Sequence, residues 1–323
     1  MREFVIAPND AGQRLDKFLQ KAVPALPPAL LYKYLRLKRI KCNNKRCDGA
    51  QKLVEGDCLR LYIGDEFFQT AESAFLAAPA VLDIVYEDEN ILLVNKPVGL
   101  VVHEDNEGTA DTLIHRIQHY LFNQKSYDPA AENSFAPALC NRIDRNTSGI
   151  VIAAKTFAAL QILNDKIKDR EIAKYYLCLV HGNPQPENGT LKGWHTKDAQ
   201  ANRVVITAKQ RPGAKTAITR YKTLARRGGT SLLEVELLTG RTHQIRAHFA
   251  AVGHPLLGDS KYGVNRMNKD NDFRFQALCS YKITFAFTTE AGALAYLKDR
   301  SFQVGATPFS KEWPVPQSQI MEA

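Results

Sequence analysis

The feature that most constrains the fold of this chain is a short apolar run, residues 150–154, that directly follows a polar turn. The run contains only isoleucine, valine and alanine, which is typical of a strand buried on both faces. The residues before it, 144–149, are rich in Asn, Thr, Ser and Gly, the residue types that favour a turn. We therefore expect a buried strand with a polar turn at its start.

Strand patterns with short connections recur through residues 81–323. Residues 81–97 are expected to form a strand, an acidic turn and a second strand, and further strands are expected at 151–154, 174–180, 217–224 and 232–238. Thr156 can cap a helix, whereas residues 192–207 are expected to form a polar excursion. Because strands outnumber helices, the prediction is an α+β fold with a mixed, largely antiparallel sheet.

The N-terminal residues carry two helical patterns and most of the net charge. Apolar residues recur at helical spacing from Arg14 to Val23, and Pro28 can open a second helix. Residues 11–52 contain eleven Lys or Arg and two Asp, a local charge of +9 that equals the formal charge of the whole chain. A basic module joined to a neutral body is the electrostatic footprint of a nucleic-acid binder. The alternative is a merely solvated basic face.

This module resembles the S4 RNA-binding domain. The matching pattern is Arg14-Leu15-Asp16-Lys17-Phe18-Leu19, then Lys41-Cys42-Asn43, then Glu55-Gly56-Asp57. It departs from that pattern at Pro27-Pro28-Ala29, where Ser-Arg is common, and at Asn44, where glycine is usual. The resemblance implies contact with RNA through the basic residues Lys33, Arg36, Lys38, Arg39 and Lys41.

The sequence composition indicates the cellular compartment of the protein. No apolar run approaches the roughly 20 residues that span a bilayer, and residues 1–10 show no signal-peptide pattern. The six cysteines include no C-x-x-C pair, which favours reduced thiols over disulfides or zinc. We expect a cytoplasmic monomer that does not contact a membrane.

Asp144 is the first candidate for chemistry, because it lies between Arg142 and Arg145. Positive charge nearby favours the ionised form of a carboxyl group. A surface turn without chemistry is the alternative interpretation of these residues alone.

A second candidate lies at Arg246, in the first turn of a helix that Thr242 is expected to cap. The N-terminal end of a helix favours anions, so an arginine there should have an anionic partner, either an RNA phosphate or a carboxylate. His243, His248 and His254 raise a zinc alternative, but their spacing does not suit a helical metal site. The sequence has no Walker A loop, no G-x-G-x-x-G after a strand and no G-x-S-x-G elbow, so we expect no cofactor and no metal.

Three ordered motifs together resemble the RluA-type pseudouridine synthases. They are Arg142-Ile143-Asp144-Arg145-Asn146-Thr147-Ser148-Gly149, Lys174-Tyr175-Tyr176-Leu177-Cys178-Leu179-Val180 and Gly240-Arg241-Thr242-His243-Gln244-Ile245-Arg246. Supporting matches are Asn95-Lys96-Pro97-Val98-Gly99 and Gly258-Asp259-Ser260-Lys261-Tyr262-Gly263. The resemblance runs from about residue 81 to residue 287, and it departs at Asn141, where histidine is usual.

The resemblance implies three domain segments and a role for each site residue. Residues 1–69 are expected to form the S4-like domain, 70–80 a linker and 81–323 the catalytic domain of pseudouridine-synthase type. Asp144 is implied to be the essential carboxylate that isomerises uridine in RNA. The other implied roles are a pairing of Arg246 with Asp144, stacking of Tyr176 on the target base, an apolar wall at Ile245, and support of the flipped uridine by Arg142.

The identity of the RNA is expected by analogy only. Large-subunit ribosomal RNA is preferred, because S4-bearing relatives act there, and tRNA is the alternative. Two other classes stay open at this stage. One is a non-catalytic RNA-binding or ribosome-assembly factor, which the basic module would also suit. The other is an RNA hydrolase or glycosylase.

Overall fold

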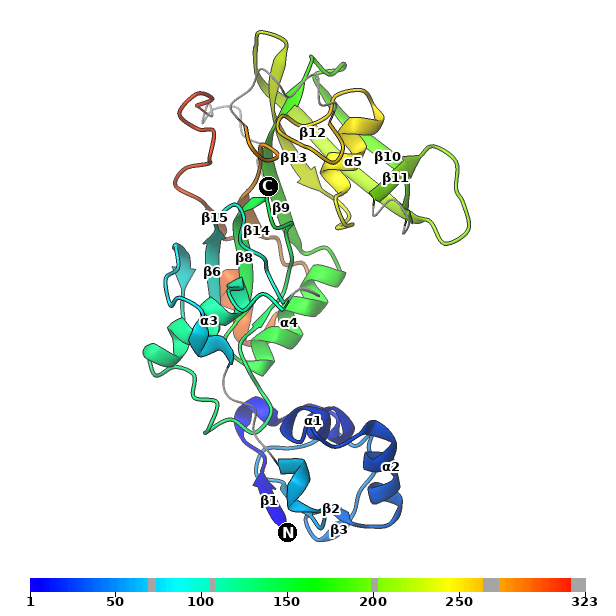
Figure 1. The fold of residues 1–323 in the computed structure, drawn as a ribbon, viewed down its shortest axis with the longest axis vertical. Helices are drawn as coiled ribbons and strands as arrows, with labels where there is room; N and C mark the ends of the chain where they lie inside the picture. The colour runs from blue at the N-terminus through cyan, green and yellow to red at the C-terminus, as the bar shows by residue number, and fades with distance from the viewer. Residues whose placement is uncertain (69–73, 105–107, 199–202, 264–272, 315–323) are drawn as a thin grey trace.

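The computed structural model describes residues 1–68, 74–104, 108–198, 203–263 and 273–314. A small N-terminal unit lies at one end of the elongated molecule, and a larger body with a long sheet makes up the rest (Figure 1). Among the described residues, no helix is long and apolar enough to cross a membrane.

The N-terminal unit packs two helices and two 3-10 turns against a small sheet. Its elements are β1 (Arg2–Val5), η1 (Pro8–Asp10), α1 (Leu15–Ala22), α2 (Pro28–Arg36), β2 (Ile40–Cys42), β3 (Lys45–Arg46), β4 (Cys58–Leu61) and η2 (Asp65–Phe68). The antiparallel sheet has the order β1-β4-β2-β3. Both predicted helices are confirmed, and α2 begins at Pro28 as expected because proline is favoured in the first turn. Strand β1 was not predicted.

The hairpin between β2 and β3 explains how the chain does without the usual glycine. Asn43 and Asn44 have φ angles of 50° and 63°, and asparagine tolerates this left-handed region better than most residues. The Asn43 side chain also closes the turn: its Nδ2 donates to Asp57 Oδ1 at 2.8 Å, and its Oδ1 accepts the Cys58 N–H at 2.9 Å.

The body is built on one mixed sheet. Its strands are β5 (Ile84–Glu87), β6 (Ile91–Lys96), β7 (Ala138–Leu139), β8 (Ser148–Ala154), β9 (Ile172–His181), β10 (Asn188–Asp198), β11 (Arg203–Thr207), β12 (Lys215–Arg227), β13 (Thr230–Leu237), β14 (Leu278–Phe285) and β15 (Ser301–Gln303). The main order is β11-β10-β12-β13-β9-β14-β8-β6-β5. Within the described strands only β8 and β14 run parallel. The predicted α+β class with a mixed, largely antiparallel sheet is confirmed.

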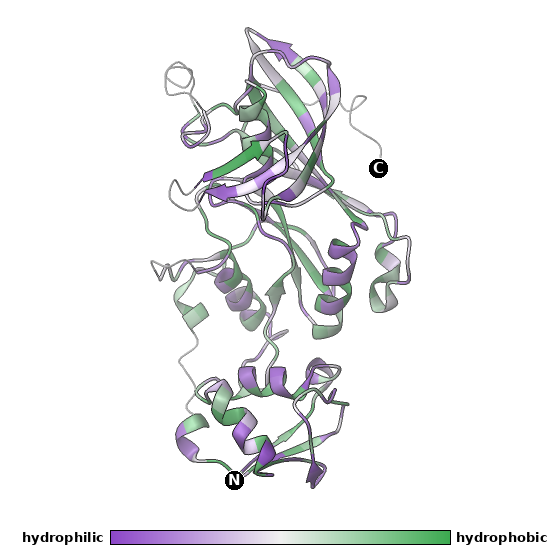
Figure 2. Ribbon diagram, turned by 90° about the vertical axis from the view of Figure 1, so that its right-hand side faces the viewer, coloured by the Kyte–Doolittle hydropathy of each residue, from purple (hydrophilic) through white to green (hydrophobic). Residues whose placement is uncertain are grey.

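The predicted buried strand after the polar turn is β8, and every one of its residues is buried. It lies between β6 and β14, and the central strands of the body are coloured as hydrophobic along much of their length (Figure 2). Its two faces belong to different apolar clusters, with Ile150 and Ile152 on one and Val151 and Ala153 on the other. The alternation of side chains along a strand accounts for this division.

Helices cover the sheet in three places. The helices are α3 (Leu113–Asn123), α4 (Phe157–Lys168) and α5 (Gln244–Ala251), with 3-10 turns η3 (Ala74–Ala77) and η4 (Gly292–Leu297). Leucine and isoleucine of α3 join the cluster on one face of β8, Ala159 and Leu163 of α4 join the cluster on the other, and α5 packs against β10, β11 and β12. The predicted cap of α4 is confirmed: Thr156 Oγ1 accepts the Ala159 N–H at 3.1 Å.

Two sequence expectations for the body need correction. The stretch predicted as a polar excursion, residues 192–207, forms part of β10 and all of β11, with residues 199–202 outside the described part. These strands carry many polar residues because β11 is the edge strand of the sheet, β10 is its neighbour, and both are partly exposed. Of the expected linker, residues 70–73 lie outside the described residues and 74–77 form η3.

The N-terminal unit is docked on the body through polar side chains. Asn9 Nδ2 donates to Glu132 Oε1 at 2.9 Å, and Gln13 Nε2 donates to Ser134 Oγ at 2.9 Å. The buried carboxylate of Asp10 accepts from Ser134 at 2.6 Å and from Asn133 at 2.7 Å. The basic face of the unit is therefore held in a defined direction relative to the body.

Candidate active site

The turn that presents Asp144 is closed by its own backbone and by a tight approach to β14. The Thr147 N–H donates to the Asp144 carbonyl at 3.0 Å. Gly149 has a φ of +110°, and a Cβ at this position would collide with the backbone of Ser280. Only glycine combines this dihedral with this close packing. The side-chain Oδ1 of Asn141 accepts the Ile152 N–H at 2.7 Å, so the residue that departs from the family pattern ties the turn to β8.

A buried lysine clamps the neighbouring loop onto this turn. The Lys96 side chain is fully buried, and its Nζ donates to the carbonyls of Pro97, Leu100 and Arg145, each at 2.8 Å. The Gly99 N–H also donates to the Arg145 carbonyl, at 3.0 Å. The position of Arg145, and with it that of Asp144, therefore depends on a buried amino group 49 residues earlier in the chain.

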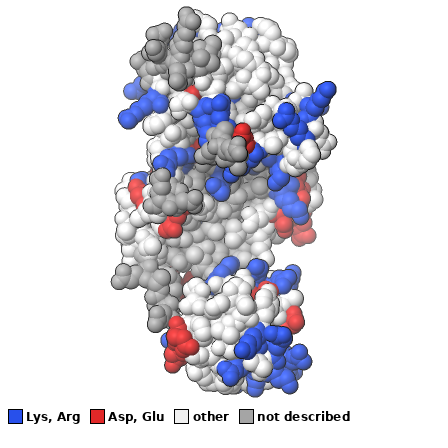
Figure 3. Space-filling model, turned by 45° about the vertical axis from the view of Figure 1, so that its right-hand side comes forward, with Lys and Arg blue, Asp and Glu red and all other residues white. Residues whose placement is uncertain are grey.

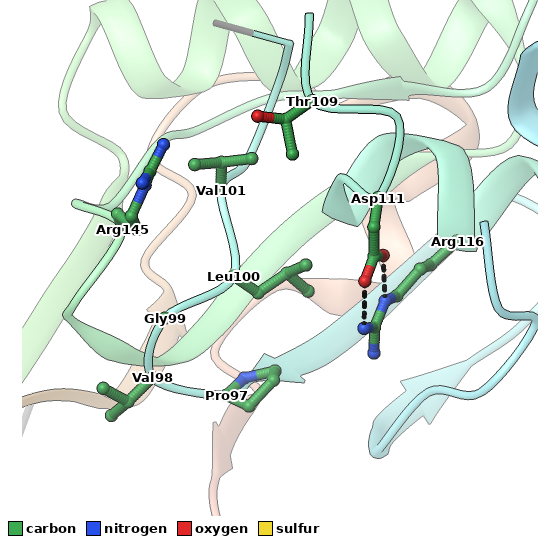
Figure 4. A pocket seen from close by; sticks show the side chains of 9 residues that line it. All are labelled: Pro97, Val98, Gly99, Leu100, Val101, Thr109, Asp111, Arg116 and Arg145. Atoms are coloured by element: carbon green, nitrogen blue, oxygen red, sulfur yellow. Dashed lines mark hydrogen bonds and ion pairs between the residues drawn. The ribbon is translucent and has the colours of Figure 1, made fainter. Parts of the chain in front are cut away.

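A cavity of about 370 Å³ lies beside this clamp. Figure 4 shows the loop from Pro97 to Val101 along its floor, Arg145 on one side and the ion pair of Asp111 with Arg116 on the other. The Arg116 guanidinium meets Asp111 through two hydrogen bonds of 2.6 and 2.7 Å, so its charge is already paired.

Arg246 joins two carboxylates from different parts of the chain. Its Nη1 donates to Asp144 Oδ2 at 2.8 Å, and its Nε and Nη2 donate to the two oxygens of Asp259 at 2.7 and 3.0 Å. Burial alone would lower the pKa of Arg246, but Asp259 and then Asp144 raise it above its ordinary value. The anionic partner predicted for this arginine is a carboxylate, and there are two.

Asp259 is the buried anchor of this group. Its side chain is fully buried, and Oδ1 also accepts the backbone N–H groups of Lys261 and Tyr262 at 2.9 and 3.0 Å. Burial alone would raise the pKa of Asp259, but the hydrogen bonds from Arg246 and these N–H groups hold it below its usual value. Asp144, by contrast, is one-quarter exposed. Asp259 therefore fixes the position of Arg246, and Asp144 is the carboxylate that solvent reaches.

The start of α5 differs from the sequence prediction. The N-cap is His243 rather than Thr242, with φ 52° and ψ 23°, and its side chain caps nothing. Its Nδ1 lies 2.8 Å from the Tyr262 hydroxyl, and its Nε2 lies 3.8 Å from Asp144 Oδ2. The left-handed residue turns the chain sharply into the helix, which places Arg246 on the side that faces Asp144.

Tyr176 and Ile245 form an apolar wall next to the carboxylate. Both side chains are buried, and they belong to one cluster that Ile143 of the turn also contacts. Burial raises the pKa of Tyr176 to about 12, so its hydroxyl is neutral at physiological pH. A part-exposed carboxylate, a fixed arginine and an aromatic ring at the edge of an apolar wall suit a reaction on a flat, polar ring that is shielded from water.

Of the remaining predicted residues, one lies on the turn of Asp144 and five lie in the N-terminal unit. Arg142 is exposed on the turn that carries Asp144. The five predicted RNA-binding residues lie in the N-terminal unit: Lys33, Arg36, Lys38 and Arg39 are exposed, and Lys41 is half-buried. Figure 3 shows lysine and arginine side chains gathered on this unit.

The three histidines considered for zinc do not converge. His248 Nδ1 bonds the Thr219 hydroxyl at 2.7 Å, and His254 Nδ1 bonds the His181 carbonyl at 2.9 Å. Burial lowers the pKa of His248 to about 4. No group of three or more His, Cys, Asp or Glu side chains in the described part of the chain could hold a metal ion. All six cysteines are free.

Sequence reasoning did not assign a role to Lys96, Asp259 or Tyr262. Each lies in a segment that supported the family resemblance, which was the available signal. Their importance comes from partners that are distant in sequence, and no local pattern identifies those partners.

Residues 90–251 match the family model of the RNA pseudouridylate synthases. An uncharacterized RNA pseudouridine synthase of Mycoplasma pneumoniae is 33% identical over 292 residues, which cover 88% of each chain. Ribosomal large subunit pseudouridine synthase C of Salmonella typhi is 31% identical over 263 residues, which cover 80% of this chain and 78% of that one.

Among solved structures, human RNA pseudouridylate synthase domain containing 1 superposes with a TM-score of 0.53 at 25% identity. The match covers 69% of this chain and 83% of the human one.

Proposed function

Since the chain belongs to the RNA pseudouridylate synthase family and isomerises uridine in RNA, we propose that Asp144 is its catalytic carboxylate. The observation that carries this proposal is the 2.8 Å pairing of Asp144 Oδ2 with Arg246 Nη1. The pairing is a charge-assisted hydrogen bond that fixes the direction of the carboxylate.

The reaction breaks the C1′–N1 bond of uridine, turns the base within the site, and joins C1′ to C5. The C5 proton is lost and N1 gains a proton, so the product is an isomer of the substrate. An ionised Asp144 serves as a nucleophile on the sugar or as a base that removes a proton. Glycoside hydrolysis generally uses two carboxylates and a water. Here the second carboxylate, Asp259, is fully buried behind Arg246, which supports isomerisation over hydrolysis.

We assign the other site residues from the same geometry. Tyr176 stacks on the target base, Ile245 supplies the apolar wall beside it, and Arg142 holds the flipped uridine out of its stack. Flipping a base costs a few kcal/mol, and stacking on an aromatic side chain recovers about 1–3 kcal/mol. No cofactor is invoked at any step.

Replacing Asp144 with Asn tests the assignment. The variant keeps the shape of the side chain and removes its charge, so pseudouridine should disappear from the target site while RNA binding persists. Pseudouridine is mapped by mass spectrometry in cells that lack the native protein and express the variant. Asp165→Asn, on the exposed surface of α4, is the matched control and should restore modification. Persistent modification with Asp144→Asn would exclude this residue as the catalytic group. A full biological effect without modification would favour the ribosome-assembly alternative.

We further propose that residues 1–69 act as an S4-like RNA anchor, joined through 70–80 to a catalytic domain of residues 81–323. The support is the exposed basic surface around α2, where the Arg39 guanidinium lies 5.5 Å from the ring centre of Tyr34. Cationic and aromatic groups side by side suit both the phosphates and the bases of RNA.

Salt dependence tests the anchor. Neutralising Arg36, Lys38 and Arg39 to Gln should weaken RNA binding and flatten the slope of log K against log salt by about 0.7–0.9 for each phosphate that the protein no longer neutralises. The matched control neutralises three exposed lysines of the body, Lys125, Lys168 and Lys298, and so produces the same net charge. Equal slopes for the two triple variants would remove the anchor role from the N-terminal unit.

Large-subunit ribosomal RNA is the substrate we propose, and tRNA is the alternative. The support is the name of the Salmonella typhi relative, a ribosomal large subunit pseudouridine synthase. We also propose a cytoplasmic monomer, and the six free thiols support the reducing compartment. Mass-spectrometric mapping of pseudouridine in both RNA classes from a deletion strain distinguishes the two substrates.

A further inference from the structure

His243 occupies a strained position that the proposed reaction does not yet explain. Its φ of 52° and ψ of 23° lie in the left-handed region, and its side chain gives the helix no capping hydrogen bond. Residues other than glycine adopt this region uncommonly, and functional sites are one of the places where they do so. The imidazole is only partly exposed, at 18%.

The contacts of the ring define which nitrogen carries the proton. The Tyr262 hydroxyl oxygen accepts the Val204 N–H at 2.9 Å and lies 2.8 Å from His243 Nδ1. A hydroxyl group has one proton to donate, and within the described residues His243 Nδ1 is the acceptor within reach. Nδ1 therefore accepts, and the proton of the neutral ring resides on Nε2.

The Nε2 nitrogen is the ring atom that lies near the proposed catalytic group. It lies 3.8 Å from Asp144 Oδ2, the same oxygen that accepts the hydrogen bond from Arg246. This separation is too long for a hydrogen bond in the free protein, and catalytic contacts commonly tighten when substrate binds. Among the described residues no hydrogen bond reaches Asp144 Oδ1, so that oxygen is the one directed to the substrate.

The charges around the ring keep it neutral. The groups that face it are Asp144, Arg246, Lys261, Asp259 and Tyr262. Burial lowers the pKa of His243, Asp144 opposes that shift, and the positive charges of Arg246 and Lys261 add to it. The guanidinium groups of Arg246 and Arg203 lie 5.1 and 5.2 Å from the centre of the Tyr262 ring, which fixes the partner of His243 in turn.

We propose that His243 is a positioning residue for Asp144, held by Tyr262 as the tautomer whose Nε2–H confines carboxylate oxygen Oδ2 and leaves Oδ1 for the uridine. The inference rests on the proposed role of Asp144. It assigns to Tyr262 and His243 a relay whose hydrogen bonds run from the β11 backbone to His243 Nδ1, and whose last contact, from Nε2 to Asp144 Oδ2, becomes a hydrogen bond when substrate binds.

The contact between His243 and Asp144 predicts that the reaction rate depends on pH. In acid the ring gains a second proton, so an imidazolium stands beside Asp144 as a second counter-charge to that of Arg246. A carboxylate with two counter-charges is less reactive, and the rate should fall as the pH drops below the pKa of His243.

The test compares three full-length variants. His243→Asn removes the ring, and asparagine tolerates the left-handed backbone. Tyr262→Phe removes the hydroxyl and keeps the ring beneath the two arginines. His119→Asn is the matched control, since this half-buried histidine on α3 likewise has its Nδ1 in a hydrogen bond, with the Ala78 carbonyl at 2.6 Å, and lies outside the proposed site. The substrate is large-subunit ribosomal RNA from cells that lack the protein, and each variant is measured in single turnovers from pH 5 to 8.

We expect His243→Asn to lower the single-turnover rate by about 10- to 100-fold, the size of effect that a misplacement of about 1 Å produces. RNA affinity should change little. The decrease of the single-turnover rate at low pH should move to a different pH or disappear. In ¹⁵N-histidine-labelled protein, the one imidazole signal that disappears in His243→Asn should have the Nε2–H pattern, and Tyr262→Phe should convert it toward the other tautomer. The control should match the unaltered protein.

The proposal would be overturned if His243→Asn kept both the rate of the unaltered protein and its decrease at low pH. An Nδ1–H tautomer in the unaltered protein would also overturn it. Asp144→Asn is run beside these variants. If Asp144→Asn remains active, the proposed function fails. If it is inactive while the His243 and Tyr262 variants behave as the control does, only the inference about His243 fails.

Discussion

Arg246 and Asp259 form a buried pair with two hydrogen bonds, of 2.7 and 3.0 Å, and this pair leaves one arginine nitrogen to hold Asp144. A guanidinium group matches a carboxylate in this two-point geometry, so its rotation is fixed. The direction of the third donor, Nη1, follows from that fixed plane. Asp259 thereby orients Asp144 without contacting it.

Asp259→Asn should lower both stability and activity. The substitution leaves the charge of Arg246 buried with half of its compensation, and breaking a buried pair costs about 3–5 kcal/mol. We expect a loss near the lower figure in denaturant unfolding, because Asp144 remains as a partner. Arg246 should also turn from its plane, so the single-turnover rate should fall. Glu187→Gln, which breaks the exposed pair with Arg226, is the control and should cost no more than about 1 kcal/mol. Equal losses in the two variants would contradict the anchoring role.

Lys96→Met should loosen the turn that carries Asp144. The variant keeps an unbranched side chain that is one atom shorter, and it leaves the carbonyls of Pro97, Leu100 and Arg145 without their buried donor. Each unsatisfied buried group costs about 1–3 kcal/mol, so we expect a loss of several kcal/mol in unfolding and a reduced kcat. The control is Lys155→Met, which removes bonds to Glu87 and Asp88 at the opposite end of β8. It should lose stability while retaining its rate. A Lys96→Met protein with an unaltered rate would show that the clamp does not position the site.

Gly149→Ala should be severely destabilising. The new methyl group would meet the backbone of Ser280 on β14, and the φ of +110° is strained for alanine. Displacing β14 from β8 disturbs the centre of the sheet, so we expect a loss of more than about 3 kcal/mol, measured by chemical denaturation. Gly213→Ala isolates the dihedral contribution, because its φ is +74° and no atom lies within 4 Å of the new Cβ. It should cost about 1 kcal/mol. If the two alanine variants are equally stable, close packing at Gly149 is not the cause.

Stability should fall in acid because of Glu171. Hydrogen bonds from Lys166 at 2.6 Å and Thr288 at 2.6 Å lower the pKa of this carboxyl group to about 2, below its ordinary value of 4.5. The folded state therefore binds fewer protons than the unfolded state between these two values. The contribution of the ionised Glu171 to the free energy of unfolding is present above pH 4.5 and is lost as the pH falls toward 2. Glu171→Gln should flatten the slope of unfolding free energy against pH in this window. The exposed-site variant Glu187→Gln should retain the slope, and a retained slope in Glu171→Gln would exclude this group as its source.

Local patterns predicted only part of the fold. Helices α1, α2 and α4 and strands β5, β6, β8, β9, β12 and β13 followed from apolar spacing and caps, whereas helix α3 and the buried central strand β14 were not predicted. Strands β10 and β11 were missed, because partly exposed strands at and next to the sheet edge carry polar residues that resemble a loop. The N-cap of α5 was misplaced by one residue, since a side-chain cap was expected and the chain turns there through a left-handed histidine instead.

The sequence by itself determined the family, the fold class and the identity of the reactive candidates, because short motifs and the spacing of apolar residues are local properties of a chain. Only the tertiary structure decided what surrounds those candidates. Asp144 meets Arg246 across 102 positions, and Lys96 reaches Arg145 across 49. Such contacts form when strands pair and helices pack, and their partners have no fixed spacing in the sequence. For this reason Asp259, Lys96 and the pair of His243 with Tyr262 emerged as parts of the site only when the chain was seen folded.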